Sequence, residues 1–192
     1  MSALRATGGE GGGARPLDRP HVAVVGGSDA GAVERAQAFS VGEALARAGA
    51  VVVCGGGGGV MEEACRGARL FADGIDGAGR GGRMDVATIG ILPGPDRTAA
   101  NPYVDVAIPT GIGELRNGLI VRAADALIAV GGAFGTLSEI ALALQAGKTV
   151  VGLGTWELAR DGLRDEAIVI APDATAAVRI ALAAAQLRSD HA

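Results

Sequence analysis

The sequence predicts an α/β fold in which helices cover both faces of a single, doubly wound parallel sheet. Two observations predict it. Short apolar runs of strand length alternate along the chain with longer segments of helical periodicity. The short runs are continuously apolar, which is typical of strands that are buried on both faces. A chain of 192 residues, 49% of them hydrophobic, is long enough to bury one core and short for two, so we expect one domain.

The strands are predicted by short runs rich in Val, Ile, Ala and Leu: residues 21–25, 51–54, 87–92, 104–108, 126–130, 149–153 and 167–171. The helices are predicted by apolar residues at helical spacing: residues 33–48, 60–68, 113–124, the segment from the turn at 131–135 to Gly147, and 173–187. Gly49 is the expected C-cap of the first helix, and Pro93 ends the third strand. Pro172 and Asp173 open the final helix. Residues 73–85 are expected to form an exposed loop rich in Gly, Asp and Arg.

Composition excludes several classes of protein. The formal charge of −4 argues against a general nucleic-acid binder, which needs a basic face. The two cysteines and two histidines are not spaced as a zinc site, so no metal is expected. Neither a signal-peptide core nor a run of about 18 apolar residues is found, so we expect a cytoplasmic protein that does not enter a membrane. Residues 1–20 are expected to be a disordered tail before one folded domain over residues 21–192.

Glycine-rich turns follow three of the predicted strands, at residues 26–27, 55–59 and 131–135. Because the carboxyl ends of parallel strands lie at one edge of a sheet, these turns are expected to meet there. The third turn opens directly into a helix, an arrangement that directs backbone N–H groups and a helix N-terminus at an anion. One such turn can be backbone geometry alone, but three at one edge predict a binding pocket.

Polar residues near the third turn have two interpretations from sequence alone. Thr136 and Glu139 match a capping box, in which Thr136 caps the helix and Glu139 bonds back to it; alternatively, Glu139 serves the site. Arg116 and Arg122 lie on the preceding helix, either as solvated side chains or as ligand contacts. Cys54 ends a buried strand and is expected to be a core residue rather than a nucleophile, because no histidine lies near it in sequence.

The third turn and its surroundings resemble the "lonely guy" proteins, nucleoside 5′-monophosphate phosphoribohydrolases that were long labelled possible lysine decarboxylases. Their signature is an arginine, an ADA-like strand and the motif PGGxGTxxE. The matching positions are Arg116, Arg122, Asp125, Gly132, Gly135, Thr136 and Glu139. Val25–Ser28 is similar to the family's first-strand turn, and Gly55–Met61 to its glycine loop. The resemblance covers about residues 21 to 187 and implies a Rossmann-like nucleotide-binding domain.

The resemblance also implies a site. Arg116 and Glu139 would be the catalytic pair, and Gly132, Gly135 and Thr136 would hold a 5′-phosphate. Cleavage of an N-glycosidic bond builds positive charge on the ribose, which a carboxylate stabilises, while an arginine offers a planar fork to phosphate or ribose oxygens. With the other turns, the candidate ligand-binding residues are Gly27, Ser28, Gly56, Gly57, Gly58, Arg122, Gly132, Ala133, Gly135 and Thr136.

Four positions depart from the signature. Proline, glycine, glutamate and lysine of the family are replaced here by Gly131, Ala133, Ser138 and Asn117. The run GTLSEIALAL and the later Gly154–Trp156 resemble a smaller branch that includes molybdenum-cofactor carrier proteins, which bind a phosphorylated pterin without turning it over.

Two functions therefore stay open. One is hydrolysis of a nucleoside 5′-monophosphate to free base and ribose 5-phosphate; the other is non-catalytic binding of molybdenum cofactor or another phosphorylated ligand. Neither requires a resident cofactor, and lysine decarboxylation is set aside because the only lysine, Lys148, follows a helix C-cap and leads into a strand. A DNA-uptake protein has a related core, but the acidic balance argues against single-stranded DNA binding. Related proteins are usually dimers, so a homodimer or higher homo-oligomer is expected.

Overall fold

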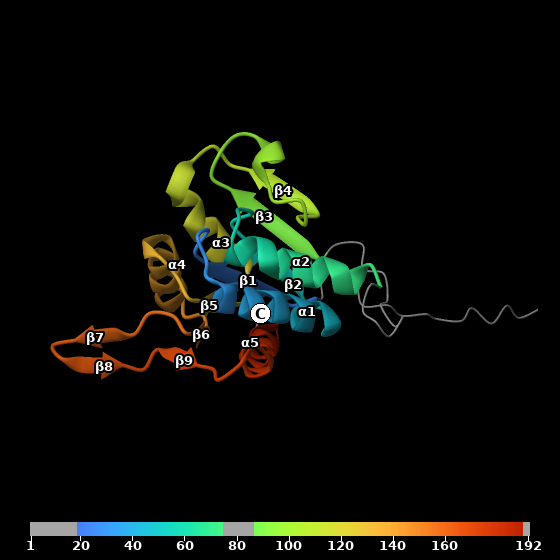
Figure 1. Ribbon diagram of the computed structural model, residues 1–192. Coiled ribbons are helices and arrows are strands. Elements are labelled where there is room, and N and C mark those ends of the chain that lie inside the picture. The colour runs from blue at the N-terminus through green and yellow to red at the C-terminus, as the bar shows by residue number, and fades with distance from the viewer. Residues whose placement is uncertain (1–18, 75–86, 190–192) are drawn as a thin grey trace, which may run out of the picture.

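The computed structural model of the protein describes residues 19–74 and 87–189 (Figure 1). Residues 1–18 of the predicted tail and most of the predicted loop over 73–85 lie outside the described residues.

The described chain is built on a parallel sheet with the strand order β4-β3-β2-β1-β5-β6-β9. The strands are β1 (His21–Gly26), β2 (Val51–Cys54), β3 (Thr88–Leu92), β4 (Val106–Pro109), β5 (Ala126–Val130), β6 (Val150–Leu153) and β9 (Ile168–Ile170). From β1 the chain builds outward to β4, then returns to the other side of β1 and builds outward again from β5. The strand order therefore reverses between β1 and β5, which are paired from Val22 with Ala126 to Gly26 with Val130. In open α/β sheets, ligands bind at this reversal, outside the carboxyl ends of the strands.

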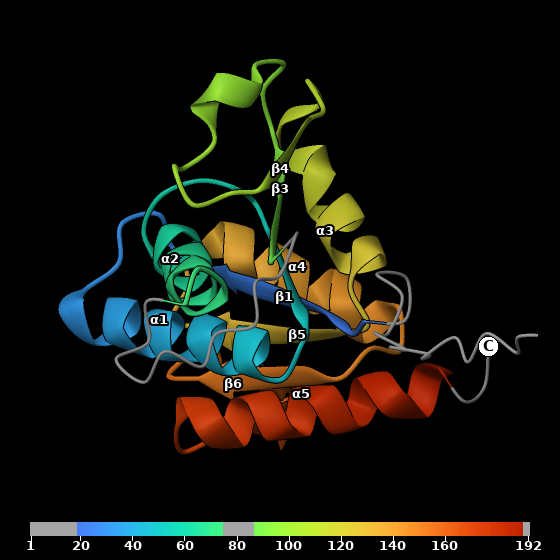
Figure 2. The same cartoon turned by 90° about the vertical axis from the view of Figure 1, so that its right-hand side faces the viewer.

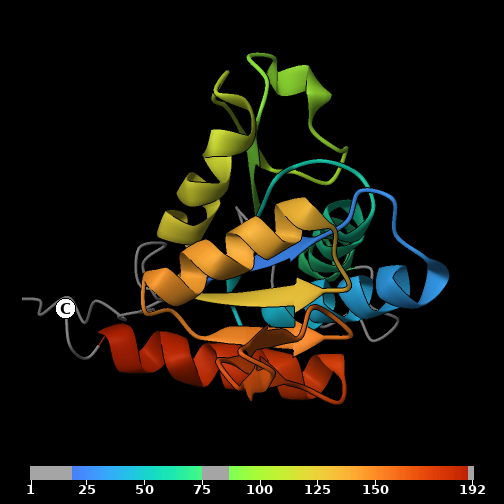
Figure 3. The ribbon, with the colours of Figure 1, turned by 90° about the vertical axis from the view of Figure 1, so that its left-hand side faces the viewer.

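Helices cover both faces of the sheet (Figures 2 and 3). They are α1 (Ala32–Arg47), α2 (Val60–Ala72), α3 (Asn117–Ala123), α4 (Phe134–Gln145) and α5 (Ala174–Ser189), with short 3-10 helices η2 (Arg97–Ala99) and η3 (Gly113–Arg116). Apolar residues of α1, α2 and α5 form one core with the sheet, and those of α3 and α4 form the other. The predicted fold class is confirmed.

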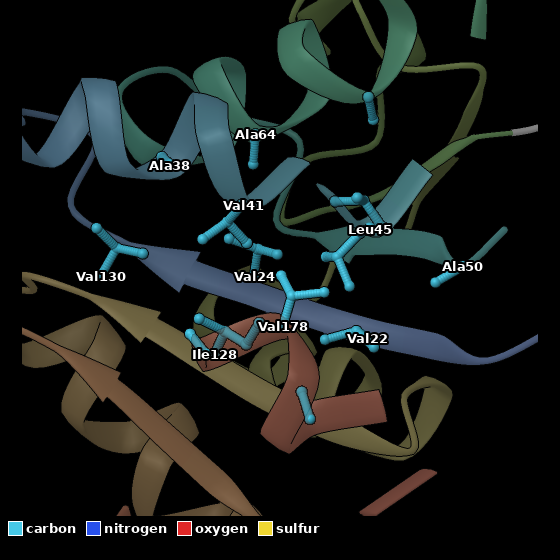
Figure 4. Packing of buried hydrophobic residues seen from close by; sticks show 14 of the residues in the cluster. Val22, Val24, Ala38, Val41, Leu45, Ala50, Ala64, Ile128, Val130 and Val178 are labelled. Atoms are coloured by element: carbon cyan, nitrogen blue, oxygen red, sulfur yellow. The ribbon is translucent and has the colours of Figure 1, made fainter. Parts of the chain in front are cut away.

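Strand β1 shows why the predicted strands are continuously apolar. Val22 and Val24 point into the core under α1, α2 and α5, whereas Ala23 and Val25 point into the core under α3 and α4. Figure 4 shows Val22 and Val24 beside Val178 of α5. The four inner residues of this strand are buried by helices on both sides, so all four are apolar.

Helices α1 and α2 touch backbone to backbone, which brings the turns that precede them together. A Cβ added at Gly42 of α1 would lie 1.9 Å from the Ala64 carbonyl oxygen of α2, and one added at Gly67 would lie 2.1 Å from the Phe39 carbonyl oxygen. Both distances are far below a normal contact, so glycine is required at both positions.

Some element boundaries differ from those predicted. The helix expected over 113–124 is divided into η3 and α3, and the helix expected over 60–68 continues to Ala72. An antiparallel pair, β7 (Leu158–Arg160) and β8 (Leu163–Asp165), was not predicted, because its residues are mostly exposed and lack an apolar pattern.

Candidate functional site

The three glycine-rich turns lie at the carboxyl ends of the neighbouring strands β2, β1 and β5. The first and second are in direct contact, because the Val60 N–H donates to the Gly27 carbonyl oxygen at 3.1 Å. Gly59 has a φ of +65°, and a Cβ there would lie 2.3 Å from the same oxygen. The end of β5 is equally close, since a Cβ at Gly26 would lie 2.5 Å from the Val130 carbonyl oxygen. The turns therefore form one continuous surface at the point where the strand order reverses.

Helix α4 begins at this surface without a side-chain cap. Its N-cap is Ala133, and the first backbone bond of the helix runs from the Leu137 N–H to the Ala133 carbonyl oxygen at 3.0 Å. The N–H groups of Phe134, Gly135 and Thr136 precede that bond, so they have no acceptor within the helix. They carry the positive end of the helix dipole and are suited to hydrogen-bond an anion.

The capping-box interpretation of Thr136 and Glu139 is wrong. Thr136 lies inside α4, three residues after the N-cap, and its side chain is buried against Gly132. Glu139 does not return to the start of the helix. It forms a hydrogen-bonded ion pair with Arg116 instead.

Arg116, at the end of η3, and Glu139 of α4 form a buried ion pair. Arg116 Nη1 lies 3.1 Å from Glu139 Oε1, and the two residues are 9% and 6% exposed. Burial raises the pKa of Glu139 to about 7, because removal from water disfavours the carboxylate; the positive charge of Arg116 offsets part of that effect. A carboxyl group with this pKa exchanges its proton near neutral pH, as an acid or base catalyst must.

The second glycine turn supports the Arg116 side chain. A Cβ at Gly55 would lie 2.5 Å from Arg116 Nη2 and 2.9 Å from Met61 Sδ, so the guanidinium rests directly on the Gly55 backbone. Sequence reasoning missed Gly55, since nothing in a run of five glycines distinguishes the one that an arginine covers. The Arg116 Nε–H is buried and has no hydrogen-bond partner within the described chain.

Asn117 and Ser138 link the ion pair to the third turn. Asn117 Oδ1 accepts from Arg116 Nη1 at 2.6 Å, while Asn117 Nδ2 donates to Ser138 Oγ at 2.6 Å. Ser138 Oγ in turn donates to the Gly135 carbonyl oxygen at 2.9 Å. Both positions had been noted from sequence only as departures from the family signature. Their neutral side chains now connect Arg116 to the start of α4.

The remaining candidate residues lie at the three turns, with the exception of Arg122. Gly27, Gly57 and Gly58 are half-buried at the junction of the turns, and Ser28 is exposed there; Gly56 is buried. Gly132, Ala133 and Gly135 are exposed at the start of α4. Arg122 is not brought to this surface: it is exposed beside a hollow of about 320 Å³ between α3 and α4, together with Gln145.

Cys54 occupies the core position that the sequence predicted. It is fully buried with its Sγ 3.5 Å from Cys65 Sγ, and it accepts a hydrogen bond from the Gly56 N–H at 3.3 Å. The hydrogen bond with Cys54, together with burial, raises the pKa of the Cys65 thiol well above its ordinary value. The pair packs beneath the second turn.

Hollows elsewhere on the described surface are not lined by these site residues. One of about 780 Å³ lies between α1 and α5, and another of about 430 Å³ borders η2 and β4. Within residues 19–74 and 87–189, no three His, Cys, Asp or Glu side chains gather as a metal site. None of the described helices is long and apolar enough to cross a membrane.

Comparison with known sequences gives two matches. The model of the SLOG cluster4 family matches residues 19–179. An uncharacterized protein of Archaeoglobus fulgidus is 42% identical over 116 residues, which are 60% of this chain and 68% of that protein.

Comparison with solved structures gives several similar folds. The molybdenum cofactor binding protein of Rippkaea orientalis has a TM-score of 0.70 and 29% identity, over 92% of this chain and 99% of that one. The molybdenum cofactor carrier protein of Chlamydomonas reinhardtii has a TM-score of 0.68 and 31% identity, over 86% and 98% of the two chains. DNA processing protein A of Helicobacter pylori has a TM-score of 0.60 at 20% identity, over 87% and 82%, which is a likeness of fold alone.

Proposed function

The chain belongs to the SLOG cluster4 family, and from this we propose that it binds a small phosphorylated ligand at the carboxyl edge of its sheet. The family match and the similar structures confirm the family and the branch that the sequence resembled. The observation that carries the proposal is the uncapped start of α4 among three glycine turns.

The start of α4 fits the phosphate end of such a ligand. Phosphate oxygens would accept from the N–H groups of Phe134, Gly135 and Thr136, and each charge-assisted bond of this kind is about twice as strong as a neutral one. A Cβ at Gly135 would meet nothing within 4 Å, so space is open beside these groups. The positive end of the helix dipole adds about 0.3 to 1 kcal/mol for a nearby negative charge.

We favour a non-catalytic binder of a phosphorylated pterin, of the kind that the similar structures represent. Glu139 supports this choice, since its carboxylate is already engaged by Arg116. The described residues would hold such a ligand through its phosphate and its ring. Any molybdenum would belong to the ligand and not to the protein.

A matched pair of substitutions at Gly135 tests the phosphate site. Gly135→Ala adds a methyl group into open space, whereas Gly135→Asp places a carboxylate among the same N–H groups. By calorimetry with ribose 5-phosphate and AMP, we expect the alanine variant to stay within about threefold of the parent and the aspartate variant to bind at least about tenfold more weakly. Equal affinity of the two variants would contradict the proposal.

Hydrolysis of a nucleoside 5′-monophosphate is the second candidate, and the buried Arg116–Glu139 pair is the observation that favours it. A carboxyl group with a pKa near 7 would stabilise positive charge on the ribose, or take a proton from the attacking water. Incubation with AMP, followed by chromatography of free adenine, tests it. No adenine above background, or equal release by Glu139→Ala, would contradict hydrolysis and leave ligand binding as the remaining function.

We also propose that the protein is a homodimer or higher homo-oligomer. Three aliphatic side chains near Arg116 are exposed. Leu115 and Leu119, four residues apart, are 81% and 44% exposed, and Ile112 is 45% exposed. Such a group of aliphatic side chains is suited to a self-complementary interface. Light scattering at micromolar concentration tests this; a monomeric parent, or a Leu115→Glu variant of unchanged mass, would contradict it.

A further inference from the structure

Two aromatic side chains meet at the edge of the sheet where the phosphate site is proposed. Phe134 is the first residue of α4, and Trp156 follows the carboxyl end of β6. Their ring centroids are 5.7 Å apart and their planes are tilted by 36°. The Trp156 indole N–H donates to the Ala133 carbonyl oxygen at 3.3 Å. The pair is therefore fixed to the N-cap residue of α4, immediately beside the N–H groups that would receive a phosphate.

The exposure of Phe134 is unusual for this chain. The sequence contains only three phenylalanines, one tyrosine and one tryptophan. Phe39 and Phe71 are half-buried and each is covered by an arginine, with the guanidinium carbon 4.7 Å from the ring centroid. Phe134 is 79% exposed even though one part of its ring contacts Trp156. The rest of the ring is free to receive a flat, apolar surface, which it does not find within the described chain.

We propose that Phe134 and Trp156 form a platform on which the planar bicyclic ring of the bound ligand stacks. This inference rests on the proposed phosphate site, because Phe134 is the first of the three residues whose backbone N–H groups form that site. A ligand with phosphate at the helix start places a ring joined by a short linker within reach of the pair. Purines in nucleotides and pterins in phosphorylated cofactors share this chemistry, and ribose 5-phosphate lacks it. The platform distinguishes ring-bearing phosphates from simple sugar phosphates.

Stacking suits the geometry of the pair. Aromatic rings prefer offset or tilted contacts with centroids about 4.5 to 7 Å apart, so a third ring can join without displacing the first two. Bases stack on aromatic side chains with little dependence on their identity, because each has a π-face. The indole hydrogen bond holds Trp156 in place before the ligand arrives, which lowers the entropic cost of binding.

The tryptophan makes the inference directly measurable, since Trp156 is the only tryptophan in the chain. We would titrate the full-length protein with ribose 5-phosphate, AMP and 6-hydroxymethylpterin phosphate, following Trp156 fluorescence and, independently, heat. The ring-bearing ligands should quench the fluorescence and bind about tenfold more tightly than ribose 5-phosphate. Comparison of AMP with the pterin distinguishes the two sources of the ring.

Phe134→Leu supplies the decisive variant, with Phe71→Leu as its control. Phe134 is exposed, so Phe134→Leu leaves the core intact, and it keeps the backbone N–H that the phosphate site uses. Phe71→Leu removes a ring under an arginine on the other face of the sheet. We expect Phe134→Leu to weaken the better ring-bearing ligand about tenfold and ribose 5-phosphate by less than about twofold. Phe71→Leu should change neither affinity by more than about twofold.

Several outcomes would overturn the platform. If Phe134→Leu lowered the affinity for all three ligands equally, or for none of them, Phe134 would not stack on the ring of the ligand. A change in oligomer mass with unchanged affinities would make the pair an interface between copies. The failures are distinguishable: binding of ribose 5-phosphate without any gain from a ring refutes the platform alone, whereas binding of no probe refutes the phosphate site as well.

Discussion

Glu139 should make the stability of the folded protein fall as pH rises through neutrality. Burial raises its pKa from the 4.5 of an ordinary glutamate to about 7. Since a pKa difference of one corresponds to about 1.36 kcal/mol, ionising Glu139 costs the folded state about 3 kcal/mol more than the unfolded chain. The folded protein keeps this advantage below pH 4.5 and loses it as the pH rises through 7.

Glu139→Gln removes the titration while retaining the size of the side chain. We expect the free energy of unfolding of the variant, relative to the parent, to rise by about 2.5 kcal/mol between pH 5 and pH 8. Loss of the Arg116 partner adds a constant offset, because arginine stays charged over this range. Only the change of this free-energy difference with pH tests whether burial raises the pKa of Glu139.

Urea unfolding at pH 5, 6, 7 and 8 measures this difference, and all other titrating groups cancel between parent and variant. Glu166→Gln is the matched control, since Glu166 is exposed. A difference curve for Glu139→Gln as flat as that of the control would refute the argument that burial dominates over the ion pair with Arg116.

Two further predictions concern glycines that are needed for close approach, with Gly118→Ala as a common control because a Cβ there meets nothing within 4 Å. Gly55→Ala should displace the Arg116 guanidinium, which lies 2.5 Å from the added Cβ, and weaken AMP binding about tenfold in calorimetry; unchanged affinity would show that Arg116 does not act on the ligand. Gly42→Ala should lower the free energy of unfolding by more than about 2 kcal/mol in urea, because the Ala64 carbonyl oxygen would lie 1.9 Å from the new methyl group. Gly118→Ala should instead raise it by about 0.5 kcal/mol, as expected for a helical position, and a similar gain at Gly42 would mean that α1 and α2 do not touch.

The sequence by itself determined the fold class and the edge at which the site lies. Strand β5 has the predicted bounds, 126–130, because a run buried on both faces is visible in the chain as an unbroken apolar segment. The glycine turns were equally visible, since a strand that ends in glycine and leads into a helix is a local pattern. Because the strands are parallel, the turns that follow them were expected at the same edge of the sheet.

Boundaries that depend on packing were harder to predict. Capping rules favoured Thr136 as the start of α4, yet the helix begins at Phe134 after an alanine N-cap without a side-chain bond. Thr136 is buried against Gly132, and that contact is absent from any local pattern. The hairpin β7–β8 was missed because its exposed residues carry no apolar signal.

Only the tertiary structure decided how the site residues meet. The spacing of 23 residues between Arg116 and Glu139 was readable, but their separation of 3.1 Å arises because α3 and α4 pack side by side on the same face of the sheet. Gly55 under Arg116, and Phe134 against Trp156, are contacts between segments that follow different strands. Periodicity and turn chemistry act over a few residues, so they are written in the chain; close approach between elements depends on the volume and burial of every side chain between them.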